Sequence, residues 1–211
     1  MINEYAAALT GENFKNNLPE ALRKMQKDYR SRGVPTILSE GLNELLLMIS
    51  IKRPERVLEL GTSVGCSAIA ILSLLKNCNL VTVEKNEQVR TEALENFKKY
   101  GVSDRVVSLI GDSFDVVKNL TAKFDFIFLD CNKAAYAILY PLLKDLLNNG
   151  GVIFADNVLF RGYVAGEKEC PKEYRSLVNK IDDFNKLVSS DKDMITCFFD
   201  VGDGIAVSVK K

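Results

Sequence analysis

The sequence contains no histidine, the side chain that most often transfers protons near neutral pH. A general base in this protein must therefore be an aspartate, glutamate, lysine, tyrosine or cysteine, and a bound metal ion would need oxygen ligands or thiolates. The five cysteines are odd in number, widely scattered and without a CxxC pair, so neither a disulfide framework nor a zinc site is indicated. We expect reduced thiols, most of them small core residues, at positions 66, 78, 131, 170 and 197.

Net charge is also absent, because 28 Lys and Arg side chains are balanced by 28 Asp and Glu side chains. The total charge therefore gives no support for binding to nucleic acid or to an anionic membrane, although a local basic patch is compatible with it. No segment approaches the roughly 20 apolar residues that span a bilayer, and the N-terminus lacks the basic start and apolar run of a signal peptide. We expect a soluble, cytoplasmic protein with no membrane partner.

From Pro54 onward the sequence alternates short apolar runs with longer helical patterns. Strands that are apolar throughout suit a parallel sheet covered by helices on both faces. We therefore predict a doubly wound α/β fold, Rossmann-like, with a mostly parallel seven-stranded sheet. The turn DVGDG predicts an antiparallel C-terminal hairpin at one edge of that sheet. The predicted strands are 56–60, 80–84, 105–110, 125–130, 151–155, 194–199 and 205–209.

The length of 211 residues is enough for one sizeable core and does not require two. We predict a single domain over residues 1–211, in which residues 1–50 form an N-terminal helical cap. A break is expected at 31–36, and Ser39 is predicted to be the N-cap of the helix that follows it.

The stretch VLELGTSVGCSAIAI places Gly61 and Gly65 in a loop between the first predicted strand and a helix. A tight turn would explain this glycine pair by itself. Glu84 changes the interpretation, because it ends the second strand, where an acidic side chain can accept both hydroxyls of a ribose. The loop lacks the G-x-G-x-x-G spacing of a pyrophosphate-binding turn, so a nucleoside without a pyrophosphate fits better than NAD.

This pattern, E-x-G-x-x-x-G followed by an acidic strand end, resembles the S-adenosylmethionine site of class I methyltransferases. The resemblance implies that Glu59 and the loop from Gly61 to Ser67 face the amino-acid part of the cofactor and that Glu84 binds the ribose. It also implies that the GDS triplet after the third strand lies beside the adenine; without the resemblance, an N-cap would explain that triplet. The further residues that the resemblance assigns to cofactor binding are Asp112, Ser113, Ile37 and Asp130.

Three oxygen-bearing side chains follow two strands that we expect to be neighbours. Asp130 ends the fourth strand, and Asp156 and Asn157 end the fifth. Adjacent parallel strands lie about 4.8 Å apart, so these side chains can converge on one point, and their hard oxygens suit Mg²⁺ or Ca²⁺. The Asp-Asn pair alone would be a turn. Lys133 lies about one helical turn after Asp130 and can point back over the same place as a base, or it is a surface lysine at a helix start.

The combination D-x-x-K-x-x-Y, then A-D-N, resembles the metal-dependent O-methyltransferases of the catechol and caffeoyl-CoA type, over most of the chain from about Pro35. The resemblance implies that Asp130, Asp156 and Asn157 bind Mg²⁺, with Mn²⁺ as the alternative, and that the ion chelates two adjacent substrate oxygens. Lys133 would take the proton of the attacking hydroxyl. Tyr136 completes the pattern, and either packs against Lys133 or belongs to the helix face.

The stretches RGVPT, DNVLFRGYVA and DVGDGIAVSV resemble the bacterial tRNA 5-hydroxyuridine methyltransferases. The resemblance implies methylation of 5-hydroxyuridine to 5-methoxyuridine at the wobble position of the tRNA anticodon loop. The alternative acceptor is a small hydroxylated aromatic compound, catechol-like or caffeoyl-CoA-like. The resemblance also implies a homodimer.

Two groups of residues are candidates for contacts with RNA. The first group lies on the basic N-terminal helix, and its charges could equally belong to an ordinary solvated helix face. The second group lies after the predicted metal ligands, and the alternative for it is a place in the core or in a dimer interface. They are Arg23, Lys24, Lys27, Arg30 and Arg32, and Phe160, Arg161 and Tyr163. A nucleotide-binding module without catalysis is another interpretation, but it would be favoured by loss of Lys133 or of a metal ligand, and these residues are present. An NAD-dependent oxidoreductase would need the tighter glycine pattern, which the loop lacks.

Overall fold

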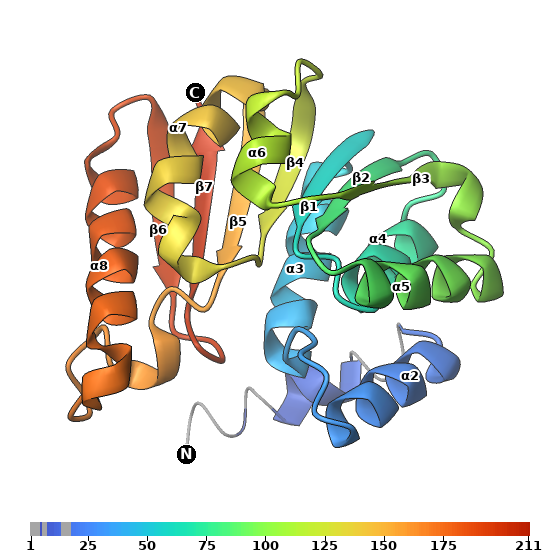
Figure 1. The fold of residues 1–211 in the computed structure, drawn as a ribbon, viewed down its shortest axis with the longest axis horizontal. Helices are drawn as coiled ribbons and strands as arrows, with labels where there is room; N and C mark the ends of the chain where they lie inside the picture. Colours follow the sequence, from blue (N-terminus) through green and yellow to red (C-terminus); the bar gives the residue numbers. More distant parts are fainter. Residues whose placement is uncertain (1–4, 6–7, 14–17) are drawn as a thin grey trace.

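The computed structural model describes residue 5, residues 8–13 and residues 18–211. Its centre is a seven-stranded sheet with the order β3-β2-β1-β4-β5-β7-β6, in which β1 to β5 are parallel and β6 and β7 form an antiparallel hairpin (Figure 1). The predicted fold class is confirmed. The strands are β1 Arg56–Leu60, β2 Asn79–Glu84, β3 Val106–Ile110, β4 Phe124–Leu129, β5 Leu147–Asp156, β6 Met194–Phe199 and β7 Ile205–Lys210.

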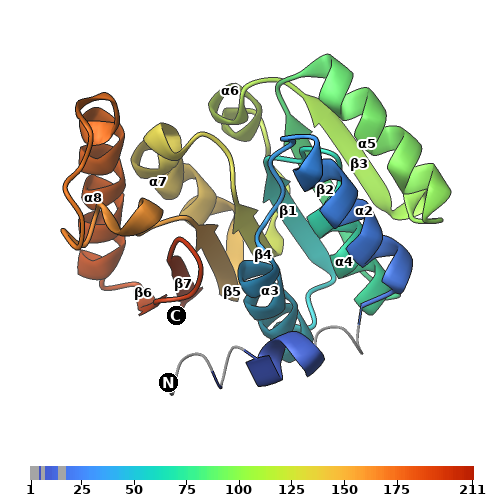
Figure 2. The same ribbon diagram turned by 90° about the horizontal axis from the view of Figure 1, so that it is seen from below.

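Helices cover both faces of the sheet, as the apolar strands require. Figure 2 shows α3 and α4 on one side of the sheet and α6, α7 and α8 on the other. The helices are α2 Glu20–Ser31, α3 Ser39–Lys52, α4 Cys66–Leu74, α5 Glu87–Lys99, α6 Ser113–Lys118, α7 Tyr136–Leu146 and α8 Arg175–Ser190. Short 3₁₀ turns are η1 Ser103–Arg105, η2 Lys133–Ala135, η3 Phe160–Gly162 and η4 Lys172–Tyr174. No helix in the described part of the chain is long and apolar enough to cross a membrane.

The core consists of two layers, one on each face of the sheet. In β4, Phe126 and Phe128 belong to the layer under α2 to α5, whereas Ile127 and Leu129 belong to the layer under α6 to α8. Successive strand residues point to opposite faces, so a strand that is buried on both faces is apolar at most positions. This explains why the second part of β4, Phe126–Leu129, is apolar at every position and ends directly before Asp130 of the site.

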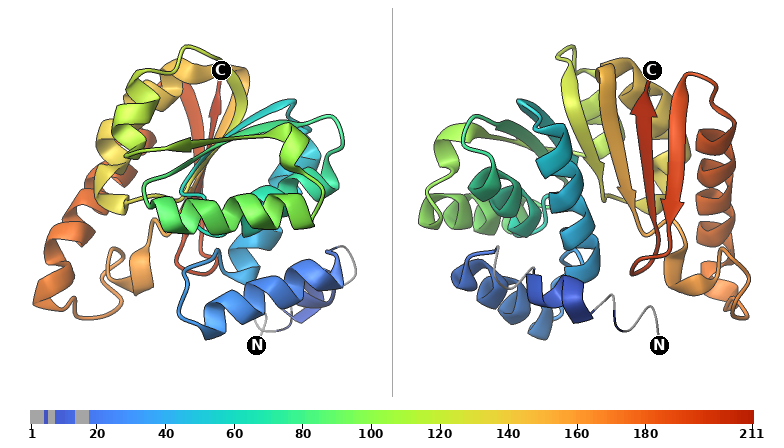
Figure 3. Two further views of the ribbon diagram at one scale, coloured as in Figure 1. Left: turned by 45° about the vertical axis from the view of Figure 1, so that its right-hand side comes forward. Right: turned by 180° about the vertical axis from the view of Figure 1, so that it is seen from behind.

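The C-terminal hairpin is attached to β5 through β7, and β6 forms the outer edge (Figure 3). Because β7 runs antiparallel to β5, the turn between β6 and β7 lies at the same end of the sheet as the carboxyl end of β5. The turn thus brings Asp203 toward the residues that follow β4 and β5.

Two predictions about local structure were wrong. Ser39 is the first residue of α3, and Leu38 occupies the N-cap position with no side-chain hydrogen bond. The cysteines are not mostly core residues: Cys66 and Cys78 are buried, whereas Cys131, Cys170 and Cys197 are at least partly exposed. All five are free thiols, as expected.

Candidate functional site

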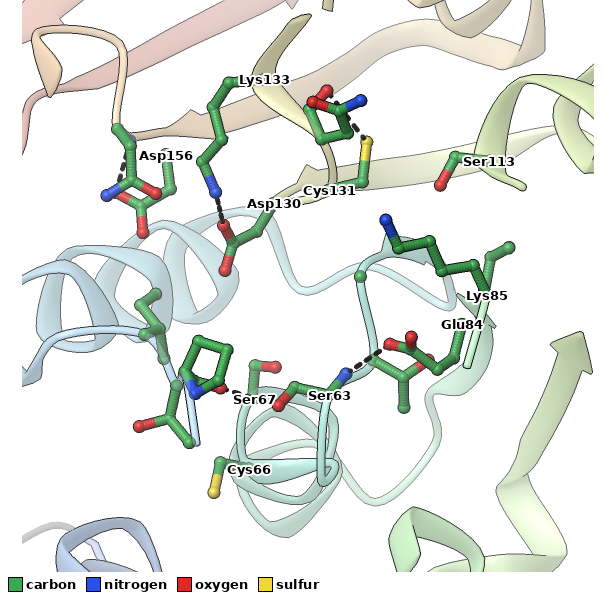
Figure 4. Close-up of a pocket in the computed structure, with 18 of the residues that line it drawn as sticks. Ser63, Cys66, Ser67, Glu84, Lys85, Ser113, Asp130, Cys131, Lys133 and Asp156 are labelled. Carbon is green, nitrogen blue, oxygen red and sulfur yellow. Dashed lines mark hydrogen bonds and ion pairs between the residues drawn. The ribbon is translucent and has the colours of Figure 1, made fainter. Parts of the chain in front are cut away.

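A cavity of about 450 Å³ lies at the carboxyl ends of the parallel strands, where β1 and β4 meet and the strand order reverses. Figure 4 shows Ser63 and Glu84 on one side of this cavity and Asp130, Lys133 and Asp156 on the opposite side. Most of the residues predicted for the site line it, namely Ile37, Gly61, Ser67, Glu84, Asp112, Ser113, Asp130, Lys133, Asp156 and Asn157. The predicted residues that do not line it are Glu59 and Gly65.

The glycine loop between β1 and α4 forms the floor of the cavity. Gly61 has φ +102°, and a Cβ on it would overlap the backbone carbonyl of Asp130. Gly65 has φ +86° and starts α4 against Phe97, whose Cε1 would lie 2.5 Å from an added Cβ. Both positions require glycine for steric reasons as well as for a positive φ. Gly65 therefore contributes to the conformation of the loop without lining the cavity.

Glu84 is held rigidly at the end of β2. One carboxylate oxygen accepts a hydrogen bond from the Ser63 backbone N–H and the other from the Asn86 backbone N–H, each at 3.0 Å. The Glu84 side chain still borders the cavity, and each of its oxygens has a further lone pair. This geometry ties the glycine loop to the strand end that is predicted to bind a ribose.

Glu59 is buried beneath the glycine loop, with no exposed surface. Its carboxylate accepts hydrogen bonds from the Ser67 hydroxyl at 2.5 Å and the Thr82 hydroxyl at 2.6 Å. Burial raises the pKa of Glu59 to about 7, and these two hydrogen bonds oppose the shift. The Glu59 carboxylate thus joins α4 to β2 and does not line the cavity, and its contact with the amino-acid part of the cofactor stays a prediction.

Asp112 and Ser113 reach the cavity from the end of β3. The Asp112 carboxylate accepts a hydrogen bond from the Phe114 backbone N–H at 2.9 Å and so caps α6. Capping and lining of the cavity occur together, as expected. Cys131 also borders the cavity, and burial raises the pKa of its thiol to about 11.

The oxygen ligands predicted for a metal ion lie together at the other end of the cavity. The ladder between β4 and β5 ends with the pair Leu129 and Ala155, so Asp130 and Asp156 are the next residues on the two strands. The Lys133 Nζ lies 2.7 Å from Asp130 Oδ1. Asn157 has φ +60°, and its backbone N–H donates to Asp156 Oδ1 at 2.7 Å. The Asn157 side-chain amide borders the cavity and has no hydrogen-bond partner among the described residues.

The electrostatics of this oxygen cluster favour a cation. Burial and then the charge of Asp130 raise the pKa of Asp156 to about 7. Burial also raises the pKa of Asp130, and Lys133 opposes that shift. Two carboxylates therefore share the positive charge of one lysine, and burial leaves their negative charges poorly solvated. Within the described residues no three His, Cys, Asp or Glu side chains cluster as metal ligands, so a site here depends on the Asn157 amide as third donor.

Tyr136 and Asp203 were not assigned a role from the sequence. The Tyr136 side chain has no exposed surface, and its hydroxyl donates to the carbonyls of Leu129 and Asp156. Asp203 borders the cavity from the β6–β7 turn, and its Oδ1 accepts a hydrogen bond from the Arg161 backbone N–H at 3.3 Å. The motif spacing pointed to Tyr136, but nothing in the sequence pointed to Asp203.

The segment after Asn157 carries an aromatic cluster. Phe160 and Tyr163 both contact Tyr174, with ring centroids 5.6 and 6.1 Å apart, and the Arg161 guanidinium lies 5.5 Å from the Tyr174 ring centroid. Phe160 and Tyr163 are partly buried and Arg161 is exposed. The predicted group thus forms a surface patch with Tyr174 and is not part of the core.

The basic side chains of α2 have different surroundings. Lys24, Lys27 and Arg30 are exposed, and Arg23 is partly buried. Arg32 lies over the Tyr29 ring at 4.3 Å and pairs with Glu92 at 3.4 Å. Arg32 therefore has partners within the protein.

The doubly wound sheet, the cavity at its switch point and the acidic residue at the end of β2 are features shared by the Rossmann-like, S-adenosylmethionine-dependent methyltransferases of class I. A family model described as O-methyltransferase matches residues 13–211, and the chain belongs to this O-methyltransferase family.

Individual relatives agree. The chain is 29% identical to a caffeoyl-CoA O-methyltransferase of Populus kitakamiensis, over 90% of this chain and 83% of that protein. It is 31% identical to the caffeoyl-CoA O-methyltransferase of Mesembryanthemum crystallinum, over 79% of this chain and 68% of that protein. The structure also resembles the SAH-bound methyltransferase PaMTH1 of Podospora anserina, with a TM-score of 0.85 and 28% identity over 99% of this chain and 97% of that one.

Proposed function

We propose that this protein transfers the methyl group of S-adenosylmethionine to one of two adjacent oxygens on a small hydroxylated aromatic acceptor, with the help of a divalent cation. The observation that supports this most directly is the position of Asp130, Asp156 and Asn157, which border the same cavity as the glycine loop and Glu84. A caffeoyl-CoA-like acceptor fits, because the similar plant proteins are caffeoyl-CoA O-methyltransferases.

The donor set suits a cation such as Mg²⁺ or Mn²⁺. Two carboxylates and an amide oxygen are hard ligands, and they leave room in an octahedral shell for water and for the acceptor. The raised pKa values of Asp130 and Asp156 support the same assignment, because a cation would replace the missing solvation of these carboxylates. A cation bound there would supply positive charge that stabilises the oxyanion of the acceptor.

The remaining side chains of the cavity hold the cofactor. Glu84 can accept the ribose hydroxyls, and the loop from Gly61 to Ser67 borders the place of the amino-acid part. Asp112 and Ser113 border the place of the adenine, and Ile37 covers the cavity from the segment between α2 and α3.

Lys133 is the proposed base. Its Nζ faces the cavity beside Asp130, and it takes the proton from the acceptor hydroxyl as that oxygen attacks the methyl carbon. The carbon–sulfur bond breaks as the carbon–oxygen bond forms, and the sulfonium leaves as a neutral thioether. Positioning and charge provide the catalysis, since the sulfonium already activates the methyl group.

A second acceptor, 5-hydroxyuridine in the tRNA anticodon loop, is favoured by the patch formed by Phe160, Arg161 and Tyr174. Aromatic rings beside an arginine can stack on an unpaired base, and the exposed lysines of α2 can contact phosphates. The 5-hydroxyl and the 4-carbonyl of this nucleoside are adjacent oxygens, so the same cation could bind both. The balanced total charge supports the small acceptor instead.

The test is methyl transfer after removal of metal with EDTA. We expect activity on a caffeoyl-type catechol to be lost and to return with Mg²⁺, whereas a monohydroxylated analogue should not be a substrate. Asp156→Ala should abolish the metal dependence together with the activity. Full activity in EDTA would show that the oxygen cluster does not act through a metal ion.

Lys133→Met tests the base. We expect kcat to fall by about 10²-fold or more, with SAH affinity unchanged. The matched control is Lys144→Met, because Lys144 has the same 22% side-chain exposure and also lies 2.7 Å from a carboxylate, at the other end of the sheet. A pH–rate profile that stays unchanged in Lys133→Met would refute the base assignment.

The tRNA acceptor is tested by nucleoside mass spectrometry of tRNA from cells with and without the gene. Loss of 5-methoxyuridine in the deletion strain would favour the tRNA acceptor, and unchanged 5-methoxyuridine would exclude it.

We also propose that the protein acts as a homodimer. Leu47 and Ile51 of α3 and Leu74 of α4 are exposed apolar side chains near the N-terminal helices. Sedimentation of the wild-type protein and of Ile51→Asp tests this proposal, and a monomer at all concentrations would refute it.

A further inference from the structure

The Tyr136 hydroxyl lies between two backbone carbonyls of the site. It is 2.9 Å from the Leu129 oxygen and 3.1 Å from the Asp156 oxygen, and the side chain is fully buried at the start of α7. A phenol carries one hydrogen, so the two carbonyls share it. Burial raises the pKa of this hydroxyl well above its usual value, which keeps it a donor.

These two carbonyls belong to the peptide groups that carry the oxygen cluster. The Leu129 carbonyl belongs to the peptide group that leads into Asp130, and the Asp156 carbonyl belongs to the one that leads into Asn157. The β4–β5 ladder has already ended at Leu129 and Ala155. The Tyr136 hydroxyl therefore links the carbonyl of the last paired residue of β4 to the carbonyl of the first residue of β5 beyond the ladder.

Beyond the ladder, each strand is also bound to its other neighbour. The Asp130 backbone N–H donates to the Leu60 carbonyl of β1 at 2.9 Å, whereas Asp156 pairs with Ile205 of β7. These contacts lie on opposite sides of the β4–β5 gap, so they do not fix its width at the level of the carboxylates. The Tyr136 hydroxyl spans that gap directly.

The same hydroxyl also joins the end of the segment from Asp130 to Tyr136 to the residue before its start, Leu129. Lys133 lies in the middle of this segment, in η2, with its Nζ 2.7 Å from Asp130 Oδ1. Fixing Tyr136 against Leu129 therefore also fixes the backbone that carries Lys133. The aromatic ring is held separately, edge-on to Phe184 of α8 at 5.3 Å.

We propose that Tyr136 is a positioning residue whose hydroxyl sets the separation between Asp130 and the Asp156–Asn157 pair so that they bind one divalent cation. The inference rests on the proposed function, because it needs the oxygen cluster to be a metal site. Tyr136→Phe removes the hydroxyl and keeps the ring that packs on Phe184. The change therefore tests the link between the two carbonyls alone.

The experiment is a titration of the protein with Mn²⁺ alone, with free Mn²⁺ measured by electron paramagnetic resonance. We expect Tyr136→Phe to weaken Mn²⁺ binding about tenfold, the loss typical when a group that orients metal ligands is removed. SAH affinity, measured by calorimetry, should stay within about twofold of the wild type, because Glu84 and the glycine loop do not contact this hydroxyl.

Tyr140→Phe is the matched control. Tyr140 lies one turn further along α7, packs on the same Phe184 ring at 6.1 Å and donates its hydroxyl to Asp191 at 3.0 Å. It is as buried as Tyr136 but points away from the oxygen cluster. We expect wild-type Mn²⁺ affinity in this variant. Replacement of Tyr136 by 4-aminophenylalanine, which retains a hydrogen-bond donor at the same place, should restore the affinity.

The outcomes separate the inference from the function on which it rests. Equal Mn²⁺ affinity in Tyr136→Phe and the wild type would overturn the positioning role but leave the metal site in place. Equal losses in Tyr136→Phe and Tyr140→Phe, or a parallel loss of SAH affinity, would overturn it as well, since they indicate general loosening. If Tyr136→Phe does not fold, a folded aminophenylalanine variant with weak Mn²⁺ binding would refute the role. A wild-type protein that does not bind Mn²⁺ would overturn both the metal site and the inference.

Discussion

Glu59→Gln should change how the stability of this protein depends on pH. The Glu59 carboxyl is fully buried and accepts hydrogen bonds from the Ser67 and Thr82 hydroxyls. Glutamine has nearly the same shape, and the hydroxyls can rotate to suit its amide. The substitution therefore removes the titration of this side chain and keeps the packing beneath the glycine loop.

The magnitude follows from the pKa. Burial raises the pKa of Glu59 from 4.5 to about 7, so the folded state holds the proton more tightly than the unfolded state. The stabilising contribution is fully present below the unfolded value and is lost as the pH rises through the folded value. Each pH unit between the two values corresponds to about 1.4 kcal/mol, which gives about 3 kcal/mol in total, most of it lost between about pH 5 and about pH 8.

Urea unfolding of the wild type and of Glu59→Gln at about pH 5 and about pH 8 measures this loss. The free energy of unfolding of the wild type should fall relative to that of the variant by roughly 2 to 3 kcal/mol as the pH rises. Glu95→Gln, a change at an exposed position on α5, should keep the wild-type pH dependence. If the wild type and Glu59→Gln lose stability in parallel, the reasoning about the buried carboxyl is wrong.

Three further changes test other parts of the site. Gly65→Ala combines a positive φ with overlap on the Phe97 ring and should lower the free energy of unfolding by about 2 kcal/mol or more. Gly166→Ala is the control, because Gly166 has φ +75° and no atom within 4 Å of an added Cβ, and it should lower the free energy of unfolding by only about 1 kcal/mol. Equal thermal shifts in the two variants would refute the packing argument. Asp112→Ala should destabilise the protein by about 1 kcal/mol because the α6 cap is lost, whereas Asp112→Asn should retain most of the wild-type stability; denaturant unfolding of both variants measures the difference. Phe160→Ala should raise the KM for an aromatic acceptor several-fold and leave SAH affinity unchanged; an unchanged KM would separate the aromatic patch from the acceptor.

The oxygen cluster was predictable because it depends on a rule that the sequence itself reveals. Continuous apolar runs mark parallel strands, and the carboxyl ends of such strands meet at one edge of the sheet. Asp130 and Asp156 stand immediately after two of these runs, and Lys133 follows at helical spacing. Local order along the chain was sufficient for these residues.

The residues that the sequence did not place depend on register or on tertiary approach. The sequence motif predicts Glu59 as a cofactor-binding residue. The parallel register, however, puts Glu59 beside Thr82, and α4 places Ser67 against it, so the carboxylate is enclosed. Asp203 reaches the cavity only because β7 pairs antiparallel with β5. Tyr136 binds carbonyls of two strands, which no spacing within one segment can reveal.

The strand order also separates the residues at the cofactor end of the cavity from the aromatic patch. Residues that border the cofactor end come chiefly from β1, β2 and β3, whereas the aromatic patch and Asp203 come from the segments after β5 and β6. Asp130, which follows β4, lies between these two groups, and its carbonyl meets Gly61. A chimera that carries the segment 158–174 of a relative should therefore acquire a new acceptor range while it retains its own cofactor affinity. The acceptor range would then depend mainly on the segment between β5 and α8.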